Sequence, residues 1–277
     1  MLLMAMASMQ LGAAFAKGLF PRVGPQGATA LRLGFSALVL IVVRRPWRGF
    51  RPGRSLAPLL AYGLSLGAMN TLFYMALRTI PLGVAIALEF IGPLSVAMLS
   101  SRRWLDLVWV AAAAGGLWLL LPLERSAHAI DAAGALLALA SGGFWALYIV
   151  FGRRVGQAFA GSGAALGMVI AAVVFVPVGV AFSGPRVFDP AVLPSGLLLA
   201  VLSSALPYSL EMRALTRLPA RVFSTLMSLE PAVGAVAGVM VLGEFPPPAQ
   251  WAGIGAVILA SLGATLTLRT DPDAARA

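Results

Sequence analysis

Long apolar runs account for most of this chain, and short segments with prolines, glycines and arginines separate them. An α-helix rises about 1.5 Å per residue, so about 20 apolar residues cross the hydrocarbon core of a bilayer. Several runs approach that length, which predicts an all-α integral membrane protein. The first run has no charged leader and no clear cleavage signal, so we expect a first span rather than a signal peptide. We expect ten transmembrane helices, at residues 2–20, 28–43, 56–77, 82–100, 106–121, 132–152, 162–182, 195–212, 220–242 and 249–268.

The composition agrees with a membrane environment. Hydrophobic residues make up 60% of the chain and charged residues 11%, with a mean hydropathy of +0.92. A soluble domain cannot bury that much apolar surface. The absence of cysteine excludes disulfides and thiolate metal sites, and the one histidine, His128, fits a loop position between apolar stretches. We therefore expect no metal site and no cofactor.

The net charge of +10 comes mainly from arginines clustered between the apolar runs. Basic residues that flank membrane helices collect on the cytoplasmic side, so this pattern indicates orientation rather than nucleic-acid binding. With the N-terminus inside, fourteen of the twenty Lys and Arg residues fall in inside segments and six fall outside. We therefore expect both termini in the cytoplasm, and contact of the inside arginines with anionic lipid headgroups.

One short segment occurs twice, 138 residues apart. The first copy, ALRTIP, ends at Pro81, and the second, ALTRLP, ends at Pro219. Another proline follows each copy at the same spacing, so Pro93 corresponds to Pro231. The matching positions indicate an internal repeat.

The repeat divides the chain into two halves with five predicted helices each. A polar external connector at 123–131 separates the first repeat, 1–122, from the second, 132–268, and a cytoplasmic tail follows at 269–277. Because five is odd, the second half enters the membrane from the opposite side, and the repeats are inverted. Inverted repeats are typical of alternating-access transporters, whose substrate site lies near the midplane where the halves meet.

Two acidic residues inside predicted helices are the strongest signal for a binding site. Glu89 lies seven residues into the fourth helix, and Glu230 lies about ten residues, or about 15 Å, into the ninth. A charged carboxylate at such depth costs on the order of 2.5–3.5 kcal/mol, so it usually faces a cavity or a partner. We expect both acids to line the substrate site. The alternative is that they are protonated or paired with Ser, Thr or Asn and hold helices together.

Prolines beside these acids free backbone carbonyls at matching places in the two repeats. Pro93 cannot donate to the carbonyl of Glu89, and Pro231 cannot donate to that of Met227. We expect these carbonyls to accept hydrogen bonds from a substrate ammonium group or from water. We also expect Pro93, Pro207 and Pro231 to break their helices and to act in gating.

Other polar and aromatic side chains gather in the repeat-related helices. An amide within a span needs partners, a hydroxyl can recognise a polar side chain, and an aromatic face can hold an ammonium group. Each aromatic residue alone is equally consistent with an ordinary core or interfacial position. The further substrate-binding candidates are Gln10, Asn70, Tyr74, Trp145, Tyr148, Ser204 and Tyr208.

Two basic side chains, Lys17 and Arg32, flank the first outer loop. They could attract a substrate carboxylate, and snorkelling toward the outer interface explains them equally well.

No catalytic motif accompanies these residues. The sequence contains no HExxH, no Walker loop and no GxSxG. A membrane enzyme that acts on lipids would need a metal or nucleophile pattern of this kind, so we do not expect an enzyme. A passive channel is a further alternative to a transporter.

Two long motifs resemble a known family. YGLSLGAMNTLFYMALRTIPLGVAIALEFIGPLSVAMLSSRR, from Tyr62, and LPYSLEMRALTRLPARVFSTLMSLEPAVGAVAG, from Leu206, are similar to the drug/metabolite transporter superfamily of the EamA type. More narrowly, they resemble the bacterial threonine/homoserine exporters, with similarity from about Met4 to Thr267. The resemblance implies ten spans, two EamA repeats, cytoplasmic termini and export of amino acids or related metabolites.

Together, these observations predict a multi-pass exporter of small amino acids, such as threonine and homoserine, in the bacterial inner membrane. We expect alternating access, and a mid-span carboxylate makes exchange with protons an option. The alternative is an exporter of broader amino acids, including aromatic ones, or of drug-like metabolites. The expected partners are the substrate and the lipid bilayer, with a monomer as the working expectation.

Overall fold

The computed structural model describes residues 1–45, 56–99, 104–120, 131–159, 162–207, 210 and 226–267. Across these ranges the chain is helical, and they contain no strand. Within the described ranges, five helices are long and apolar enough to cross a membrane, and four shorter apolar helical segments accompany them. The prediction of an all-helical protein rich in apolar helices is confirmed. Tyr208, residues 123–130, the tail 269–277, and parts of the predicted helices 195–212 and 220–242 lie outside the described residues.

The first two predicted helices form one element, α1 (Leu2–Arg44), with a sharp bend at Gly24. Gly24 has φ 71° and ψ 170°, a conformation that only glycine adopts readily. Pro21 and Pro25 flank this position, and Pro25 lacks an N–H and disfavours a helical residue before it. The loop expected between the first two spans is therefore a bend inside one element.

The fourth predicted helix is interrupted. After α2 (Ala57–Ala76), the chain forms α3 (Leu82–Glu89) and α4 (Ile91–Leu99), with a break at Phe90. Pro93 supplies the physical reason, because it cannot donate to the carbonyl four residues earlier.

Three long helices follow: α5 (Trp104–Leu120), α6 (Ala132–Phe159) and α7 (Gly163–Ser183). α6 continues seven residues beyond its predicted end at residue 152. A short 3₁₀ helix, η2 (Gly184–Phe188), follows α7.

The remaining described elements include two π-helical turns. α8 (Leu193–Ala200) continues as the π-helix η3 (Val201–Ala205), and α11 (Glu230–Ala237) continues as the π-helix η4 (Gly238–Leu242). The last element is α12 (Pro248–Thr267). π-helical turns often occur at functional sites.

Pro207 changes the hydrogen bonding of η3. In a π ladder each N–H donates to the carbonyl five residues earlier, so Pro207 leaves the carbonyl of Leu202 without that donor. The hydroxyl of Ser8 donates to this carbonyl at 2.8 Å, and Ser36 donates to the hydroxyl of Ser204 at 2.8 Å. Because Ser8 and Ser36 lie on opposite sides of the bend, both parts of α1 bind η3.

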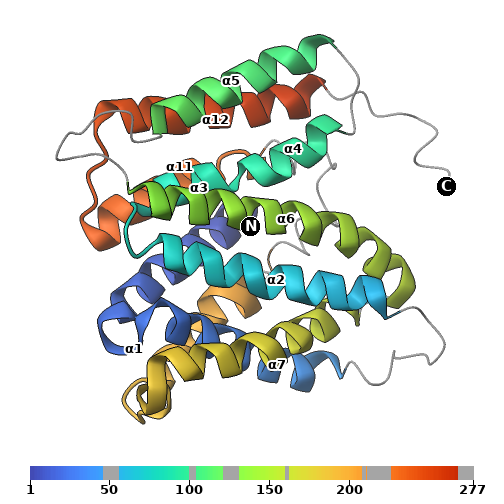
Figure 1. The fold of residues 1–277 in the computed structure, drawn as a ribbon, viewed down its shortest axis with the longest axis vertical. Helices are drawn as coiled ribbons and strands as arrows, with labels where there is room; N and C mark the ends of the chain where they lie inside the picture. The colour runs from blue at the N-terminus through green and yellow to red at the C-terminus, as the bar shows by residue number, and fades with distance from the viewer. Residues whose placement is uncertain are drawn as a thin grey trace.

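The two halves of the sequence interleave in space. α5 and α12 lie side by side at one end of the molecule, and α1 packs against α7 at the other end (Figure 1). α2 packs against α6 and α7 between them. Each of these pairs joins an element from before the connector to one from after it.

α3 and α11 pack against each other in opposite directions. Leu82, at the start of α3, lies near Gly238, just past the end of α11, whereas Ile86 lies near Gly234, earlier in α11. The glycines permit this close approach, because a Cβ at Gly234 would clash with the Ile86 side chain. Gly234 and Gly238, four residues apart, thus lie on the face of this segment that meets α3.

Candidate functional site

A cavity of about 80 Å³ lies where α1, α2, α3, α6 and α11 meet. Its lining combines polar amides, two carboxylates, one guanidinium group and apolar or aromatic side chains. Elements from both halves of the chain contribute to it. The lining residues are Met9, Gln10, Ala13, Arg32, Met69, Asn70, Phe73, Ile86, Glu89, Trp145 and Glu230.

Glu89, the last residue of α3, is held by a serine of α6. Its side chain is 8% exposed, and Oε1 lies 2.5 Å from the hydroxyl oxygen of Ser141. The same hydroxyl lies 2.8 Å from the carbonyl oxygen of Met69 in α2. A serine hydroxyl has one hydrogen to donate. Both contacts are hydrogen bonds at once when a protonated Glu89 donates to Ser141 and Ser141 donates to Met69.

Glu230, the first residue of α11, is held by a glutamine of α1. It is 4% exposed, and its Oε1 accepts a hydrogen bond of 3.1 Å from the amide of Gln10. Gln10 is also buried and lies 220 residues away in sequence. Under the alternative that the acids hold helices together, the expected partners were Ser, Thr or Asn; Glu89 meets a serine, and Glu230 meets a glutamine.

Asn70 and Trp145 complete the polar and aromatic parts of the lining. The amide of Asn70 donates to the carbonyl of Leu66 at 2.7 Å, one turn earlier in α2. This leaves the side-chain oxygen of Asn70 as an acceptor at the cavity wall. The ring of Trp145 meets the edge of Phe90 with centroids 5.6 Å apart, so an aromatic pair flanks the break between α3 and α4.

Arg32 is the one cation among the residues that line the cavity. Its Nη1 donates to the hydroxyl of Tyr74 at 3.2 Å, and its guanidinium carbon lies 5.5 Å from the centre of the Tyr74 ring. Nη2 approaches the carbonyl of Ser203 at 3.5 Å. Of the two readings of Arg32 from the sequence, the structure therefore favours a position at the cavity over snorkelling to the interface.

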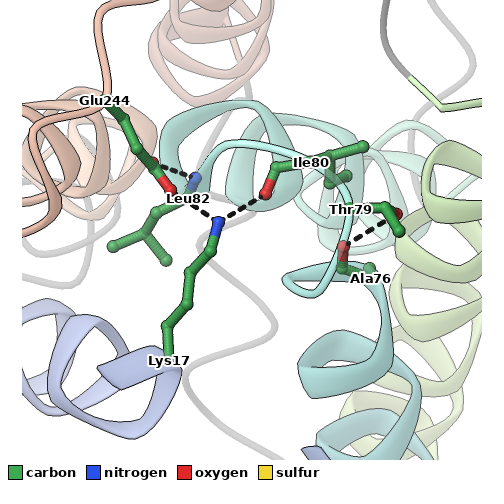
Figure 2. A network of polar contacts seen from close by, with 6 residues as sticks. All are labelled: Lys17, Ala76, Thr79, Ile80, Leu82 and Glu244. Atoms are coloured by element: carbon green, nitrogen blue, oxygen red, sulfur yellow. Dashed lines mark hydrogen bonds and ion pairs between the residues drawn. The ribbon is translucent and has the colours of Figure 1, made fainter. Parts of the chain in front are cut away.

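Lys17 has a different environment, shown in Figure 2. Its ammonium lies 2.5 Å from Oε1 of Glu244 and donates to the carbonyl of Ile80 at 2.9 Å. The other oxygen of Glu244 accepts a hydrogen bond of 2.7 Å from the N–H of Leu82, at the start of α3. We call Lys17, Glu244, Ile80 and Leu82 the clasp. It joins α1, α3 and the segment before α12. Lys17 therefore binds a carboxylate of the protein itself, which neither interpretation from the sequence had included.

Five predicted site residues line the cavity: Gln10, Asn70, Glu89, Trp145 and Glu230. They come from α1, α2, α3, α6 and α11, so the fold brings together residues up to 220 positions apart. Their predicted role in substrate binding stays a prediction, now supported by a shared cavity.

Four other candidates, described next, do not line the cavity. Tyr74 is fully buried and positions Arg32, whereas Tyr148 stacks on Tyr62 with ring centroids 4.8 Å apart. Ser204 bonds to Ser36, as described above. Met227 packs against an apolar cluster with Leu2 and Met6.

The prolines also have defined places. Pro207 is buried next to η3, and Pro231 is buried in the first turn of α11, where a missing N–H is tolerated. The carbonyl of Glu89, which Pro93 frees, faces α6 at Gly142. A Cβ on Gly142 would lie 2.5 Å from that carbonyl oxygen. This carbonyl thus packs against a helix backbone.

No signal in the sequence singled out Ser141, which contacts Glu89. Ser141 is an ordinary serine in an apolar helix, and only the packing of α6 against α2 and α3 reveals its role. Arg32 had a stronger signal, because an ionisable residue within a span is a functional candidate by default. Within the described ranges, no three His, Asp or Glu side chains gather closely enough to hold a metal ion.

Comparisons with known proteins show which transporters this chain resembles. The model of the EamA-like transporter family matches residues 132–266. The chain is 53% identical over 270 residues to the threonine/homoserine exporter RhtA of Escherichia coli (strain K12), covering 98% of this chain and 92% of that protein. It is 52% identical over 271 residues to the RhtA of Salmonella typhimurium (strain LT2), with the same coverage.

More distant relatives extend the likeness. The uncharacterized transporter YwfM of Bacillus subtilis (strain 168) is 28% identical over 249 residues, covering 85% of this chain and 82% of that one. A solved crystal structure at 20% identity has a similar fold, with a TM-score of 0.60 and coverage of 98% of this chain and 97% of that one.

Proposed function

The chain belongs to the EamA-like transporter family, and we propose that it exports small amino acids such as threonine and homoserine across a bacterial inner membrane. As a member of that family it is a multi-pass membrane transporter and not an enzyme. The observation that carries the proposal is the cavity between the two halves, with two carboxylates and a guanidinium group in its wall. The names of the relatives supply the substrate class.

The proposed topology has ten transmembrane helices in two inverted repeats, 1–122 and 132–268, with both termini in the cytoplasm. The bend at Gly24 supports two crossings by α1. The opposed directions of α3 and α11 support inversion, because these elements belong to the fourth spans of the two repeats. The distribution of arginines supports the orientation.

We expect the substrate ammonium to bind between Glu89 and Glu230. Both side chains are buried at the cavity, and each has a hydrogen-bonding partner, Ser141 for Glu89 and Gln10 for Glu230. Oxygen acceptors at fixed positions suit an ammonium group, which has three N–H donors. The Asn70 oxygen offers a further acceptor for a substrate hydroxyl, a group that threonine and homoserine share.

The cavity favours small substrates over the alternative of aromatic or drug-like ones. Sites for drug-sized ligands typically have volumes of about 300–1,000 Å³. The cavity here measures about 80 Å³, and Ile86, Phe73 and Trp145 limit it with bulky side chains.

Proton exchange is the coupling that the Glu89 site supports. Protonated Glu89 completes the hydrogen bonds to Ser141 and Met69, whereas an ionised Glu89 would compete with Met69 for the hydrogen of Ser141. Binding of a substrate ammonium to the ionised form would then displace a proton. We propose that Glu89 alternates between these two states during transport.

Counterflow in proteoliposomes tests the function directly. Purified protein in liposomes loaded with unlabelled threonine should take up labelled threonine saturably. Protein-free liposomes, and protein with both Glu89→Gln and Glu230→Gln, serve as controls. Flux that rises linearly without saturation would indicate a passive channel. Competition by phenylalanine, methionine or a cationic dye as strong as that by homoserine would favour the broader exporter.

A further inference from the structure

We propose that Arg32 binds the carboxylate of the substrate, so that the site requires a free carboxylate in addition to an ammonium group. This inference rests on the proposed amino acid export and specifies how that site selects its substrate class. Three observations carry it: the position of Arg32, the way it is held, and the two carboxylates in the same cavity lining.

Arg32 lies in the second part of α1, about eight residues past the bend at Gly24, or roughly 12 Å along the helix axis. It is half-buried and lines the same small cavity as Glu89 and Glu230. A cation at this depth is costly unless it has a function or a partner. Its location at the cavity wall places the guanidinium group beside a molecule bound in the cavity.

The guanidinium group is held from behind by residues of α2 and η3. Tyr74 is a rigid support for the guanidinium group, because its ring is fully buried. The rings of Phe20 and Phe73 pack against it, with centroids 6.0 and 6.2 Å away. The Tyr74 hydroxyl and ring and the Ser203 carbonyl together orient Arg32. A guanidinium group that is fixed in advance loses less freedom when it binds a ligand.

The charges of the lining match an amino acid zwitterion. A guanidinium group presents N–H donors in a planar fork that binds a carboxylate through two parallel hydrogen bonds. Glu89 and Glu230 provide the opposite charge for the ammonium group in the same cavity. Lys17, a second basic residue of α1, is engaged by Glu244 and does not line the cavity. Among the described residues that line the cavity, Arg32 is therefore the group that can bind the carboxylate.

A specific selectivity follows. Molecules that keep the ammonium group and side chain but lack the carboxylate should bind poorly, since they lose the charged hydrogen bonds to the guanidinium group. Threoninol, in which a CH₂OH group replaces the carboxylate of threonine, is the matched probe.

The test measures competition against labelled threonine in the counterflow assay. In the unaltered protein, threoninol should compete roughly 10- to 100-fold less well than threonine, as expected for loss of hydrogen bonds to a charged group. Arg32→Gln should raise the half-saturating threonine concentration by a similar factor and remove the discrimination against threoninol. Arg32→Lys should retain part of the threonine affinity and part of the discrimination against threoninol. Arg22→Gln, at an exposed arginine near the bend, is the matched control and should change neither.

Two results would overturn the inference: threoninol competing as well as threonine in the unaltered protein, or Arg32→Gln keeping the discrimination. Thermal unfolding and gel filtration establish whether Arg32→Gln is folded; if it is not, the threoninol comparison and Arg32→Lys decide. A failure of the export proposal looks different, because the unaltered protein would then show no saturable threonine counterflow.

Discussion

The ammonium of Lys17 lies 2.5 Å from Glu244, a residue 227 positions later in the chain, and the same carboxylate caps the first turn of α3. In the proposed topology this clasp lies at the outer end of the helices that line the cavity. An exporter that works by alternating access must open its outer side to release substrate. The clasp contacts would then have to separate once in each cycle.

We expect Lys17→Gln and Glu244→Gln each to destabilise the conformation in which the clasp is formed. The two side chains are 21% and 16% exposed, so the pair is largely shielded from water. Loss of a hydrogen bond to a charged group should lower the free energy of unfolding by about 1.5–3 kcal/mol. Thermal unfolding in detergent measures this loss. Exchange of the two residues, Lys17→Glu with Glu244→Lys, should recover part of it, and no recovery would mean that the ion pair itself contributes little.

Glu89→Gln should keep the fold and remove the pH dependence of transport. A glutamine amide can donate to Ser141, so it imitates the protonated acid and leaves the bond from Ser141 to Met69 in place. Threonine counterflow measured across a range of pH tests this, with Glu230→Gln as the comparison. An unchanged pH profile in Glu89→Gln would show that this acid does not carry the proton.

Gly142→Ala should destabilise the contact between α6 and the break after α3. A Cβ at Gly142 would lie 2.5 Å from the Glu89 carbonyl oxygen, and one at Gly92 would clash with the carbonyl of Gly142. Overpacking of this kind costs about 1–3 kcal/mol. The adjacent Gly143→Ala is the matched control, because a Cβ there meets no atom within 4 Å. Equal melting temperatures for the two variants would contradict the close contact.

Asp131, just before α6 and outside the membrane-spanning segments, should make stability depend on pH. Its Oδ2 accepts a hydrogen bond of 2.8 Å from the N–H of Gly134. This bond, together with one to the Thr79 hydroxyl, holds the pKa of Asp131 below its ordinary value of 3.8. The ionised carboxylate therefore stabilises the folded state above that value, and the contribution is lost as the pH falls through the lowered pKa.

The matching variants are Asp131→Ala and Asp131→Asn. Asp131→Ala should lower the melting temperature at neutral pH, and its difference from the unaltered protein should shrink below about pH 4. Asp131→Asn keeps a side-chain oxygen that can accept the hydrogen bond from the N–H of Gly134, so its melting temperature should fall less than that of Asp131→Ala. A difference that stays constant down to acidic pH would rule out the titration of Asp131 as its cause.

Some features of the candidate site could be read from the sequence because they depend on position along a helix. Glu89 and Glu230 were expected at the cavity since their depth in apolar runs leaves few other environments for a carboxylate. The break after Glu89 follows from Pro93, which lacks an N–H wherever it is placed. Gln10 and Asn70 were expected there for the same reason as the acids, because an amide in a span needs partners.

Other features depended on contacts between distant segments. The engagement of Lys17 by Glu244, the role of Ser141 beside Glu89, and the support of Arg32 by Tyr74 and Ser203 each join elements that the sequence does not place side by side. Tyr148 and Met227 were expected at the site, and the fold places them in apolar clusters instead of the cavity lining.

By itself, the amino-acid order determined the all-helical membrane character, the repeat, and the depth of each polar group along its helix. Only the tertiary structure decided which polar groups face one another. The physical reason is that a membrane helix is apolar on nearly all sides, since lipid and neighbouring helices are similarly apolar. Its rotation about its own axis is therefore set by packing, at glycines such as Gly142 and Gly234, and not by a hydrophobic stripe.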